Sequence, residues 1–272
     1  LYKKNLIYKG YTIQPYSPMA GTGLSSHELN QPGTYRDVMD TTIVAQFKAD
    51  NSSTMKLKAM IEGADLPSEL PLYFLAWTTT PWTLPSNTAL TVGAKIDYVI
   101  VRTTNKYTGT DGLVALAENL VEKQFHKGPD YEVLGKCKGA ALVGMKYEQL
   151  IDWAQPMQDP DQAFRVISGD FVTTEDGTGI VHTAPTFGAD DALVAKAAGV
   201  PPMLVDDGSG HGVPLVDMQG RLREGHGPFP GRFVKNEYYK DGEAPEKSVD
   251  VEIAIDLKTR GLAFKVEKYS HS

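Results

Sequence analysis

Cysteine is nearly absent from this sequence, because the chain of 272 residues contains only Cys137. A single cysteine excludes an internal disulfide framework and suits a reducing compartment. Long apolar runs are also missing, since no stretch approaches the roughly 18 to 20 residues that a membrane-spanning helix needs. The sequence has neither an initiator methionine nor a signal-peptide pattern. We therefore expect a cytoplasmic piece of a longer polypeptide that makes no contact with a membrane.

Motifs that mark metal and nucleotide sites are missing as well. The six histidines and the cysteine match no zinc-ligand spacing, and there is no His-Glu-x-x-His motif. Gly177 and Gly179 are not followed by the third glycine of a dinucleotide fingerprint. The stretch GSGHG at 208–212 resembles a nucleophile elbow only superficially, and its turn-forming neighbours predict a hairpin loop. We expect neither a metal ion nor a cofactor in this chain.

The charge and composition narrow the class of protein further. The formal net charge of −7 at pH 7 argues against a general nucleic-acid coat. Glycine (26 residues) and proline (17 residues) are spread along the sequence, which favours many turns and short strands over long helices. We therefore expect a mixed α/β fold that is rich in strands.

Local patterns place the elements of this fold. β-branched and aromatic residues predict strands at 41–49, 70–77 and 97–104. Apolar residues at helical spacing predict helices at 113–125, 189–199 and 249–261, the last two ending at Gly199 and Gly261. The Asp-Gly pair within residues 170–185 predicts a hairpin of two strands.

One domain is expected, because no repeat and no convincing linker interrupts the pattern. The predicted globular core covers residues 38–261. Residues 1–37 alternate short apolar pieces with turns, which is typical of a β-ribbon with a loop. Since the termini of an inserted domain usually lie close together, we expect residues 1–37 and 262–272 to form a β-ribbon stalk to the rest of a longer chain.

Three consecutive threonines, Thr78, Thr79 and Thr80, follow the buried strand of the peptide LPLYFLAW. Pro81 forces the chain out of regular pairing at this point, so the hydroxyls can point into a cleft. The alternative is that threonine is simply a good strand residue and proline ends the strand. Trp82 and Asn87 follow on the same loop. A tryptophan at a cleft can stack on a nucleobase, although filling the core is the commoner role.

The second polar group lies in the peptide GTGIVHTAPTFGADD, residues 177–191. His182 falls on a predicted strand, where a histidine is more often a packing residue than a catalyst. Asp190 and Asp191 fall at a helix start, where aspartate most often acts as a cap. Two adjacent aspartates cannot both cap the helix, so one of them is free for another role.

Taken together, WTTTPWTLPSN and GTGIVHTAPTFGADD resemble the editing domain of the isoleucyl-tRNA synthetase family. This domain is the large connective-peptide insert of the class I catalytic domain. The peptides GTGLSSHEL, GPFPGRFVK and LAFKVEKYSHS also resemble pieces of that insert, so the resemblance covers nearly the whole chain. The sibling valyl and leucyl enzymes have an arginine at the position of Thr80, and Trp82 further favours the isoleucyl branch. The HIGH and KMSKS signatures are missing, which agrees with an excised insert whose ATP-using catalytic domain lies elsewhere.

The resemblance implies a β-barrel-like core that hydrolyses valine from tRNA(Ile), after and possibly also before transfer to the tRNA. Its partners would be the valine-charged 3′ end of tRNA(Ile) and the rest of the synthetase chain. One methylene in a pocket is worth about 1–3 kcal/mol, or roughly 10–200-fold, a magnitude for which enzymes of this family are the standard example. A synthetic pocket sized for isoleucine therefore admits valine, and a second, smaller site is needed to destroy the product.

Site roles follow from the resemblance residue by residue. Asp191 matches the aspartate that holds the substrate α-ammonium, which suits a charge-assisted bond. His182 matches the histidine beside the side-chain pocket, where it narrows the site against isoleucine. Thr79 and Thr80, with Thr78 beside them, would position the ester, the attacking water and the valine side chain.

Two further roles concern the nucleotide and the chemistry. Trp82 and Asn87 would contact the terminal adenosine of the tRNA. Ester hydrolysis needs an oriented water and donors for the oxyanion, which hydroxyls, backbone amides and the substrate's ribose hydroxyl supply. The resemblance assigns no general base.

Other functions stay open on the sequence. A threonine nucleophile could act with His182 and Asp191 as a triad and form a covalent intermediate. The chain could instead be a non-catalytic module that binds the tRNA 3′ end. It could also have the valyl specificity and act on Thr-tRNA, although Thr80 and Trp82 speak against this.

Overall fold

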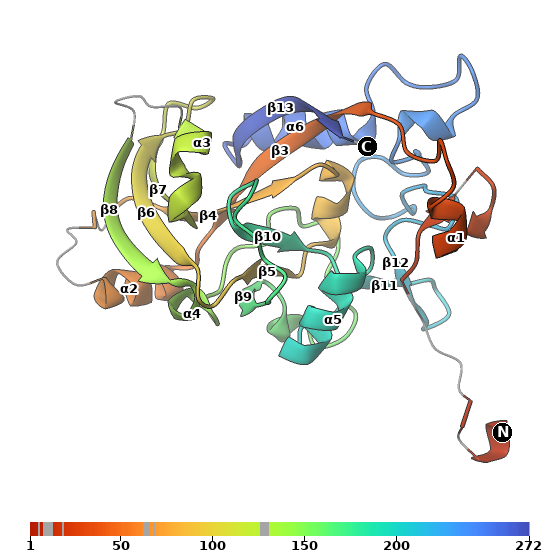
Figure 1. Cartoon of the computed structure of the whole chain (residues 1–272), viewed down its shortest axis with the longest axis horizontal. Helices are drawn as coiled ribbons and strands as arrows, with labels where there is room; N and C mark the ends of the chain where they lie inside the picture. The colour runs from red at the N-terminus through yellow and green to blue at the C-terminus, as the bar shows by residue number, and fades with distance from the viewer. Residues whose placement is uncertain are drawn as a thin grey trace.

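The computed structural model describes residues 1–4, 6–7, 13–17, 19–61, 66–67, 69–125 and 131–271. A nine-stranded sheet runs through the middle of this part of the chain (Figure 1). Its strands are β3 (Val38–Lys48), β4 (Leu72–Thr78), β5 (Ala89–Val92), β6 (Asp97–Thr104), β7 (Asp111–Ala117), β8 (Tyr131–Lys138), β9 (Arg165–Ser168), β10 (Ile180–Thr183) and β13 (Ala263–His271). Two smaller ribbons pair β1 (Tyr16–Ser17) with β2 (Thr22–Gly23), and β11 (Leu204–Asp206) with β12 (Gly212–Pro214).

The sheet branches at β4. One side of β4 pairs antiparallel with β3, which in turn pairs with β13. The other side is shared, because β7 runs parallel to the start of β4 at residues 72–74 and β10 runs parallel to its end at Trp77. The main path through the sheet is β8-β6-β7-β4-β10-β5-β9, with β3 and β13 branching from β4, and the sheet curls into a half-barrel (Figure 1).

Short helices surround the sheet. The α-helices are α1 (Ser26–Leu29), α2 (Asn51–Met60), α3 (Val121–Phe125), α4 (Gly139–Leu142), α5 (Ala189–Ala198) and α6 (Val249–Thr259). The 3₁₀ helices are η1 (Tyr2–Lys4), η2 (Pro81–Ser86), η3 (Glu118–Leu120), η4 (Pro160–Gln162) and η5 (Asn236–Tyr238). Within the described part of the chain, none of the helices is long and apolar enough to cross a membrane.

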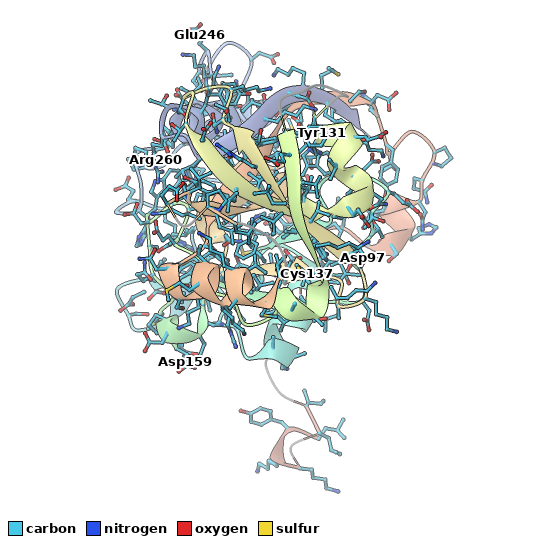
Figure 2. All side chains as sticks on the ribbon, turned by 90° about the vertical axis from the view of Figure 1, so that its left-hand side faces the viewer. Asp97, Tyr131, Cys137, Asp159, Glu246 and Arg260 are labelled. Atoms are coloured by element: carbon cyan, nitrogen blue, oxygen red, sulfur yellow. The ribbon has the colours of Figure 1, made fainter. Side chains whose placement is uncertain are left out.

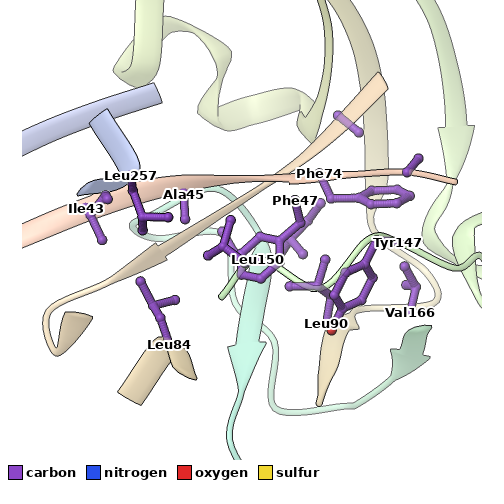
Figure 3. Close-up of a cluster of buried hydrophobic side chains, with 14 of the residues drawn as sticks. Ile43, Ala45, Phe47, Phe74, Leu84, Leu90, Tyr147, Leu150, Val166 and Leu257 are labelled. Carbon is purple, nitrogen blue, oxygen red and sulfur yellow. The ribbon is translucent and has the colours of Figure 1, made fainter. Parts of the chain in front are cut away.

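β4 and residues 41–47 of β3 are buried on both faces, which explains the nearly continuous apolar sequence of β4. One face packs into the main core together with α6, as Figure 3 shows for Ile43, Phe47, Phe74 and Leu257. The opposite face packs a second cluster that consists of Val44, Leu75, Val99, Val101, Val114, Leu116, Val121 and Phe264. Burying one such large side chain stabilises the fold by about 1.5–3 kcal/mol.

The outer strand β8 forms one edge of the sheet. Tyr131 and Cys137 lie towards its two ends in Figure 2. Cys137 is a free, partly buried thiol, and burial raises its pKa to about 11. Lys138 pairs with Asp97 of β6 at 2.9 Å on the exposed side. Charged side chains of this kind protect an edge strand from pairing with another chain.

Most of the predicted elements are confirmed. The predicted strands at 41–49, 70–77 and 97–104 are β3, β4 and β6, and the predicted helices at 189–199 and 249–261 are α5 and α6. Gly199 and Gly261 follow these helices with the positive φ angles of 68° and 71° that favour glycine. The stretch at 208–212 lies in the turn of the β11–β12 hairpin except for Gly212, which begins β12.

The predicted helix at 113–125 is wrong in its first half. Residues Asp111–Ala117 form the central strand β7, and only Val121–Phe125 are α-helical. The peptide LVALA is apolar at consecutive positions and is buried throughout. A short continuous apolar run fits a buried strand as well as a helix, so its spacing could not decide between them.

The predicted hairpin at 170–185 is also wrong. β9 ends at Ser168, β10 begins at Ile180, and the two strands lie on opposite sides of β5 instead of pairing. The intervening loop is held elsewhere, because the Thr178 hydroxyl donates to the Leu75 carbonyl at 2.6 Å and the Ala117 N–H donates to the Thr178 carbonyl at 2.8 Å. Tertiary contacts therefore override the local turn signal.

The terminal segments are placed in part. Residues 263–271 form β13, which pairs with β3 along the main sheet. The only ribbon described within residues 1–37 is the short β1–β2 pair, while residues 5, 8–12, 18 and 272 lie outside the described residues. The division into a core at 38–261 and a stalk at 1–37 and 262–272 stays a prediction.

Candidate functional site

The threonine-rich peptide leaves the sheet at the end of β4. Thr78 is the last residue of that strand, and η2 begins at Pro81 after its N-cap residue Thr80. Proline suits the first helical position, because its ring fixes φ and its missing N–H needs no partner there. The Thr78 hydroxyl accepts the Thr80 N–H at 3.1 Å and lies 3.3 Å from the Thr80 hydroxyl. The turn therefore gathers two hydroxyls at the end of the strand.

β10 brings the second motif to the same place. It runs parallel to β4, with Val181 opposite Trp77. Parallel strands present their carboxyl ends at one edge of a sheet, so His182 lies beside the threonine peptide. The chain then turns and enters α5, whose first turn carries Asp190 and Asp191.

These segments enclose a pocket with a volume of about 290 Å³. Five of the predicted site residues line it, namely Thr78, Thr79, Thr80, His182 and Asp191. The remaining walls come from Trp77, Thr83, Val181, Ala184, Phe187 and Gly188. The fold thus brings two motifs that are far apart in the sequence into one site.

Asp191 supplies a carboxylate to this pocket. Its Oδ2 accepts the backbone N–H of Ala184 at 2.8 Å. Burial raises the pKa of the carboxyl above its usual value; the Ala184 N–H opposes the rise and the nearby charge of Asp190 adds to it. Gly188 leaves room for the side chain, because a Cβ there would stand 2.7 Å from the Asp191 Cγ. A carboxylate held in this way is suited to a cationic ligand.

His182 contributes a neutral ring. It is only 8% exposed, and burial lowers its pKa to about 4. Nδ1 lies 2.9 Å from the amide nitrogen of Asn87, and Nε2 lies 3.0 Å from the hydroxyl of Thr83. At neutral pH the imidazole is therefore an uncharged wall of the pocket, fixed by a partner at each nitrogen.

Trp82 and Asn87 lie behind the pocket lining. The Trp82 ring packs edge-on against Phe187 with the ring centroids 4.9 Å apart. Asn87 is 3% exposed, and its amide group bonds to Ala89 and Tyr147 as well as facing His182. Both residues support the walls of the pocket, and their contact with an adenosine stays a prediction.

A buried ion pair anchors the peptide from outside the two motifs. Asp250 of α6 is 2% exposed, and its Oδ1 accepts the backbone N–H of Trp82 at 2.8 Å. Lys235 pairs with Asp250 at 2.7 Å and with Asp40 at 3.1 Å. Burial raises the pKa of Asp250 although Lys235 opposes the rise, whereas the two carboxylates raise the pKa of Lys235 although burial opposes them.

Sequence reasoning missed several of these residues. Thr83 and Phe187 fall inside the two quoted motifs, so a closer reading of the motifs could have included them. Tyr147 and Asp250 reach the site only through tertiary contacts, and no local pattern marks them.

The contacts of His182 do not match a nucleophilic triad. In a triad, a carboxylate accepts from the histidine Nδ1 and the other ring nitrogen takes a proton from the nucleophile. Here Nδ1 faces the Asn87 amide nitrogen, and the Asp191 carboxylate bonds to Ala184. Among the described residues there is also no group of three or more His, Cys, Asp and Glu side chains placed to hold a metal ion. The site therefore offers a carboxylate, several hydroxyls and a neutral ring.

Comparison with solved structures identifies the fold. GlLeuRS-CP1 matches this chain with a TM-score of 0.58 at 16% identity, covering 83% of this chain and 98% of that chain. The fold is therefore that of a synthetase CP1 domain, and the predicted strand-rich α/β fold of the editing-domain type is confirmed.

Sequence comparison defines the family. No family model matches the chain. The isoleucine–tRNA ligases of Bacteroides fragilis and Cytophaga hutchinsonii are 51% identical over 303 positions and 52% identical over 296 positions, covering 100% of this chain. The chain belongs to the isoleucine–tRNA ligase family, which confirms the predicted resemblance. It spans about a quarter (25%) of the length of the curated relatives it matches.

Proposed function

We propose that this chain is a hydrolytic editing site that removes valine from tRNA(Ile). The observation that carries the proposal is the convergence of the Asp191 carboxylate and the threonine hydroxyls in one pocket of about 290 Å³. The relatives are named as ligases of isoleucine and tRNA, and the fold is one that synthetases use for a CP1 domain. Within the complete ligase, the 3′ end of the tRNA would enter this pocket.

Asp191 binds the α-ammonium of the substrate in this proposal. An ionised carboxylate and an ammonium form a charge-assisted bond, which is stronger than a bond between neutral groups. The Ala184 N–H holds the carboxylate in place from behind. An amino acid with a blocked amine would lose this bond and leave the partly buried carboxylate without a cation.

Thr79 and Thr80 act at the scissile ester, and Thr78 supports them. A water oxygen attacks the ester carbonyl carbon, the bond from that carbon to the ribose oxygen breaks, and the ribose oxygen takes a proton. The products are free valine and uncharged tRNA. Hydroxyl groups that orient the water and donate to the developing oxyanion lower the barrier to this step.

His182 sets the size of the side-chain pocket. Its ring is buried and neutral, so it acts as a steric wall against the extra methylene of isoleucine. A smaller pocket rejects an extra methylene by overpacking, which costs typically about 1–3 kcal/mol. The same pocket accepts the valine moiety of valyl-adenylate, so hydrolysis before transfer to tRNA belongs to the proposal as well.

The test is hydrolysis of Val-tRNA(Ile) and Ile-tRNA(Ile) by this chain and by the complete ligase. The variant Asp191→Ala is compared with Asp190→Ala, a matched control because Asp190 is the exposed neighbour on the same helix turn. Loss of a charge-assisted bond of about 1.5–3 kcal/mol predicts a roughly 10- to 150-fold slower hydrolysis of Val-tRNA(Ile) for Asp191→Ala alone.

Three results would count against the proposal. Equal losses in both variants would mean that Asp191 has no special role. Hydrolysis of both substrates at the same rate by the unchanged protein would remove the specificity for valine. Binding of tRNA without hydrolysis, in the complete ligase too, would leave a non-catalytic module.

A further inference from the structure

A line of hydrogen bonds runs from Tyr147, below the pocket, to the threonine peptide. The Tyr147 hydroxyl donates to Asn87 Oδ1 at 2.6 Å, and the Asn87 amide nitrogen lies 2.9 Å from His182 Nδ1. On the other side of the ring, His182 Nε2 lies 3.0 Å from the Thr83 hydroxyl. Thr83 in turn donates to the Thr80 carbonyl at 2.8 Å. Among the residues of this line, the function proposed for the pocket gives a role only to His182 and Thr80.

The orientation of the Asn87 amide is fixed by its neighbours. Its nitrogen donates to the Ala89 carbonyl at 2.8 Å, and a carbonyl can only accept. Its oxygen accepts from Tyr147. A flipped amide would place two oxygens against each other at Ala89, so the nitrogen must be the atom that faces His182.

This orientation decides where the His182 proton lies. Because the Asn87 nitrogen donates, Nδ1 must accept, and a neutral imidazole then carries its hydrogen on Nε2. Thr83 can accept from that Nε2–H, because its own hydroxyl hydrogen is directed to the Thr80 carbonyl. Every step of the line thus has one donor and one acceptor.

Tyr147 is held firmly enough to act as the fixed end of the line. The residue is 4% exposed, and its ring packs edge-on against Phe47 and Phe164, with centroids 5.4 Å and 6.3 Å away. Figure 3 shows the ring within the main core cluster. Burial raises the pKa of its hydroxyl well above the usual value, so the group remains a donor.

We propose that Tyr147 and Asn87 are positioning residues that hold His182 in its Nε2–H form and fix the plane of its ring. In this inference, which rests on the proposed function, they set the valine-over-isoleucine specificity through His182 and not by contact with the amino-acid side chain of the substrate. With the hydrogen on Nδ1, two N–H groups would face each other at Asn87. Thr83 would also have to turn its hydroxyl from Thr80 to the ring.

The first measurement is the tautomer of His182 in the protein labelled with ¹⁵N-histidine, because the two ring nitrogens have different chemical shifts in each tautomer. The signal is assigned from its loss in His182→Gln. We expect the Nε2–H form in the unchanged protein and the Nδ1–H form in Asn87→Asp, because a carboxylate accepts where the amide donated. An Nδ1–H form in the unchanged protein, or an unaltered tautomer in Asn87→Asp, would refute the inference.

The second measurement tests Tyr147 through Tyr147→Phe, which keeps the ring and removes the hydroxyl. Loss of one hydrogen bond, about 1–1.5 kcal/mol, predicts a mixture of tautomers and a roughly tenfold smaller ratio of Val-tRNA(Ile) to Ile-tRNA(Ile) hydrolysis in the complete ligase. Tyr98→Phe is the control, because the Tyr98 hydroxyl is also buried and donates to a backbone carbonyl, that of Gly179, at 2.5 Å. We expect this control to lose stability while the His182 tautomer and the specificity ratio stay unchanged.

The two readouts separate this inference from the proposed function. The tautomer is measured without substrate. If the protein shows the expected tautomers but hydrolyses neither charged tRNA, the proposed function is wrong and the positioning role stands. Selective hydrolysis with a pure Nε2–H form and an unchanged ratio in Tyr147→Phe would overturn the role of Tyr147 alone.

Discussion

The substitution Asp250→Ala tests most directly how the threonine peptide is anchored behind the pocket. This aspartate holds the first turn of η2 through the Trp82 N–H at 2.8 Å and pairs with Lys235 at 2.7 Å. The alanine variant removes both contacts and leaves the rest of α6 unchanged. We expect a large loss of stability from this single change.

The magnitude follows from the burial of the groups left behind. A buried N–H without an acceptor costs about 1–3 kcal/mol. Removing one partner of a fully buried ion pair costs about 3–5 kcal/mol. Here Lys235 keeps Asp40 at 3.1 Å, and 17% of its side chain is exposed, so the loss lies at the low end. We expect the free energy of unfolding to fall by about 4 kcal/mol in total, which adds the low ends of the two costs.

The assay is urea unfolding at pH 7, with Asp256→Ala as the matched control. Asp256 lies on the same helix and pairs with Arg260 at 2.9 Å, but 53% of its side chain is exposed. Pairs of this kind contribute about 0.3–0.5 kcal/mol, so the control should lose no more than that. The midpoint and the slope of each transition are compared, since an unchanged slope attributes the difference to stability.

Equal transitions for the two variants would refute the reasoning. In that case Asp250 would not anchor η2, and the position of the threonine peptide would depend on the main-core packing alone. A changed slope would instead mean that the unfolded or native state itself differs, and Asp250→Asn would then serve as the comparison because it keeps an acceptor for the Trp82 N–H.

Two further predictions concern the chemistry of the pocket. His182→Ala should widen the site, so that hydrolysis of Ile-tRNA(Ile) rises roughly tenfold or more relative to Val-tRNA(Ile) in a deacylation assay; an untouched Ile-tRNA(Ile) would rule out the steric role. The activity should also fall in acid, because burial raises the pKa of Asp191 and the ionised carboxylate, which binds the ammonium, is lost as the pH decreases through that value. Asp190→Asn removes a charge that contributes to this rise, so the acid limb of kcat/KM should move to lower pH. If the limb does not move, the loss of activity in acid does not come from protonation of Asp191.

Local sequence signals were sufficient to predict the elements that have a typical composition or a glycine stop signal. β3, β4 and β6 have the β-branched and aromatic content of strands, and α5 and α6 are followed within two residues by glycines with positive φ. The same signals gave the wrong prediction for β7, because a strand buried on both faces shows no alternation of apolar and polar residues.

The lining of the pocket was more predictable than its support. Thr78, Thr79 and Thr80 belong to one peptide, and His182 and Asp191 to another, so each group could be recognised from neighbouring residues. Tyr147 and Asp250 contact those peptides from distant parts of the chain. Their identities, a tyrosine in the core and an aspartate near a helix start, are common in structural roles, so sequence alone could not assign them to the site.

The anchoring of Trp82 by Asp250 also fixes when the pocket can form as the protein is synthesised. The two residues are 168 positions apart. At about 5–20 residues per second, a ribosome needs roughly 10 to 30 s to reach Asp250 after it has made the threonine peptide. During that interval the peptide lacks the acceptor that secures its first turn, and β3 still lacks its partner β13. The hydroxyls therefore take their final places only after α6 has been made, which separates the synthesis of the site from its assembly.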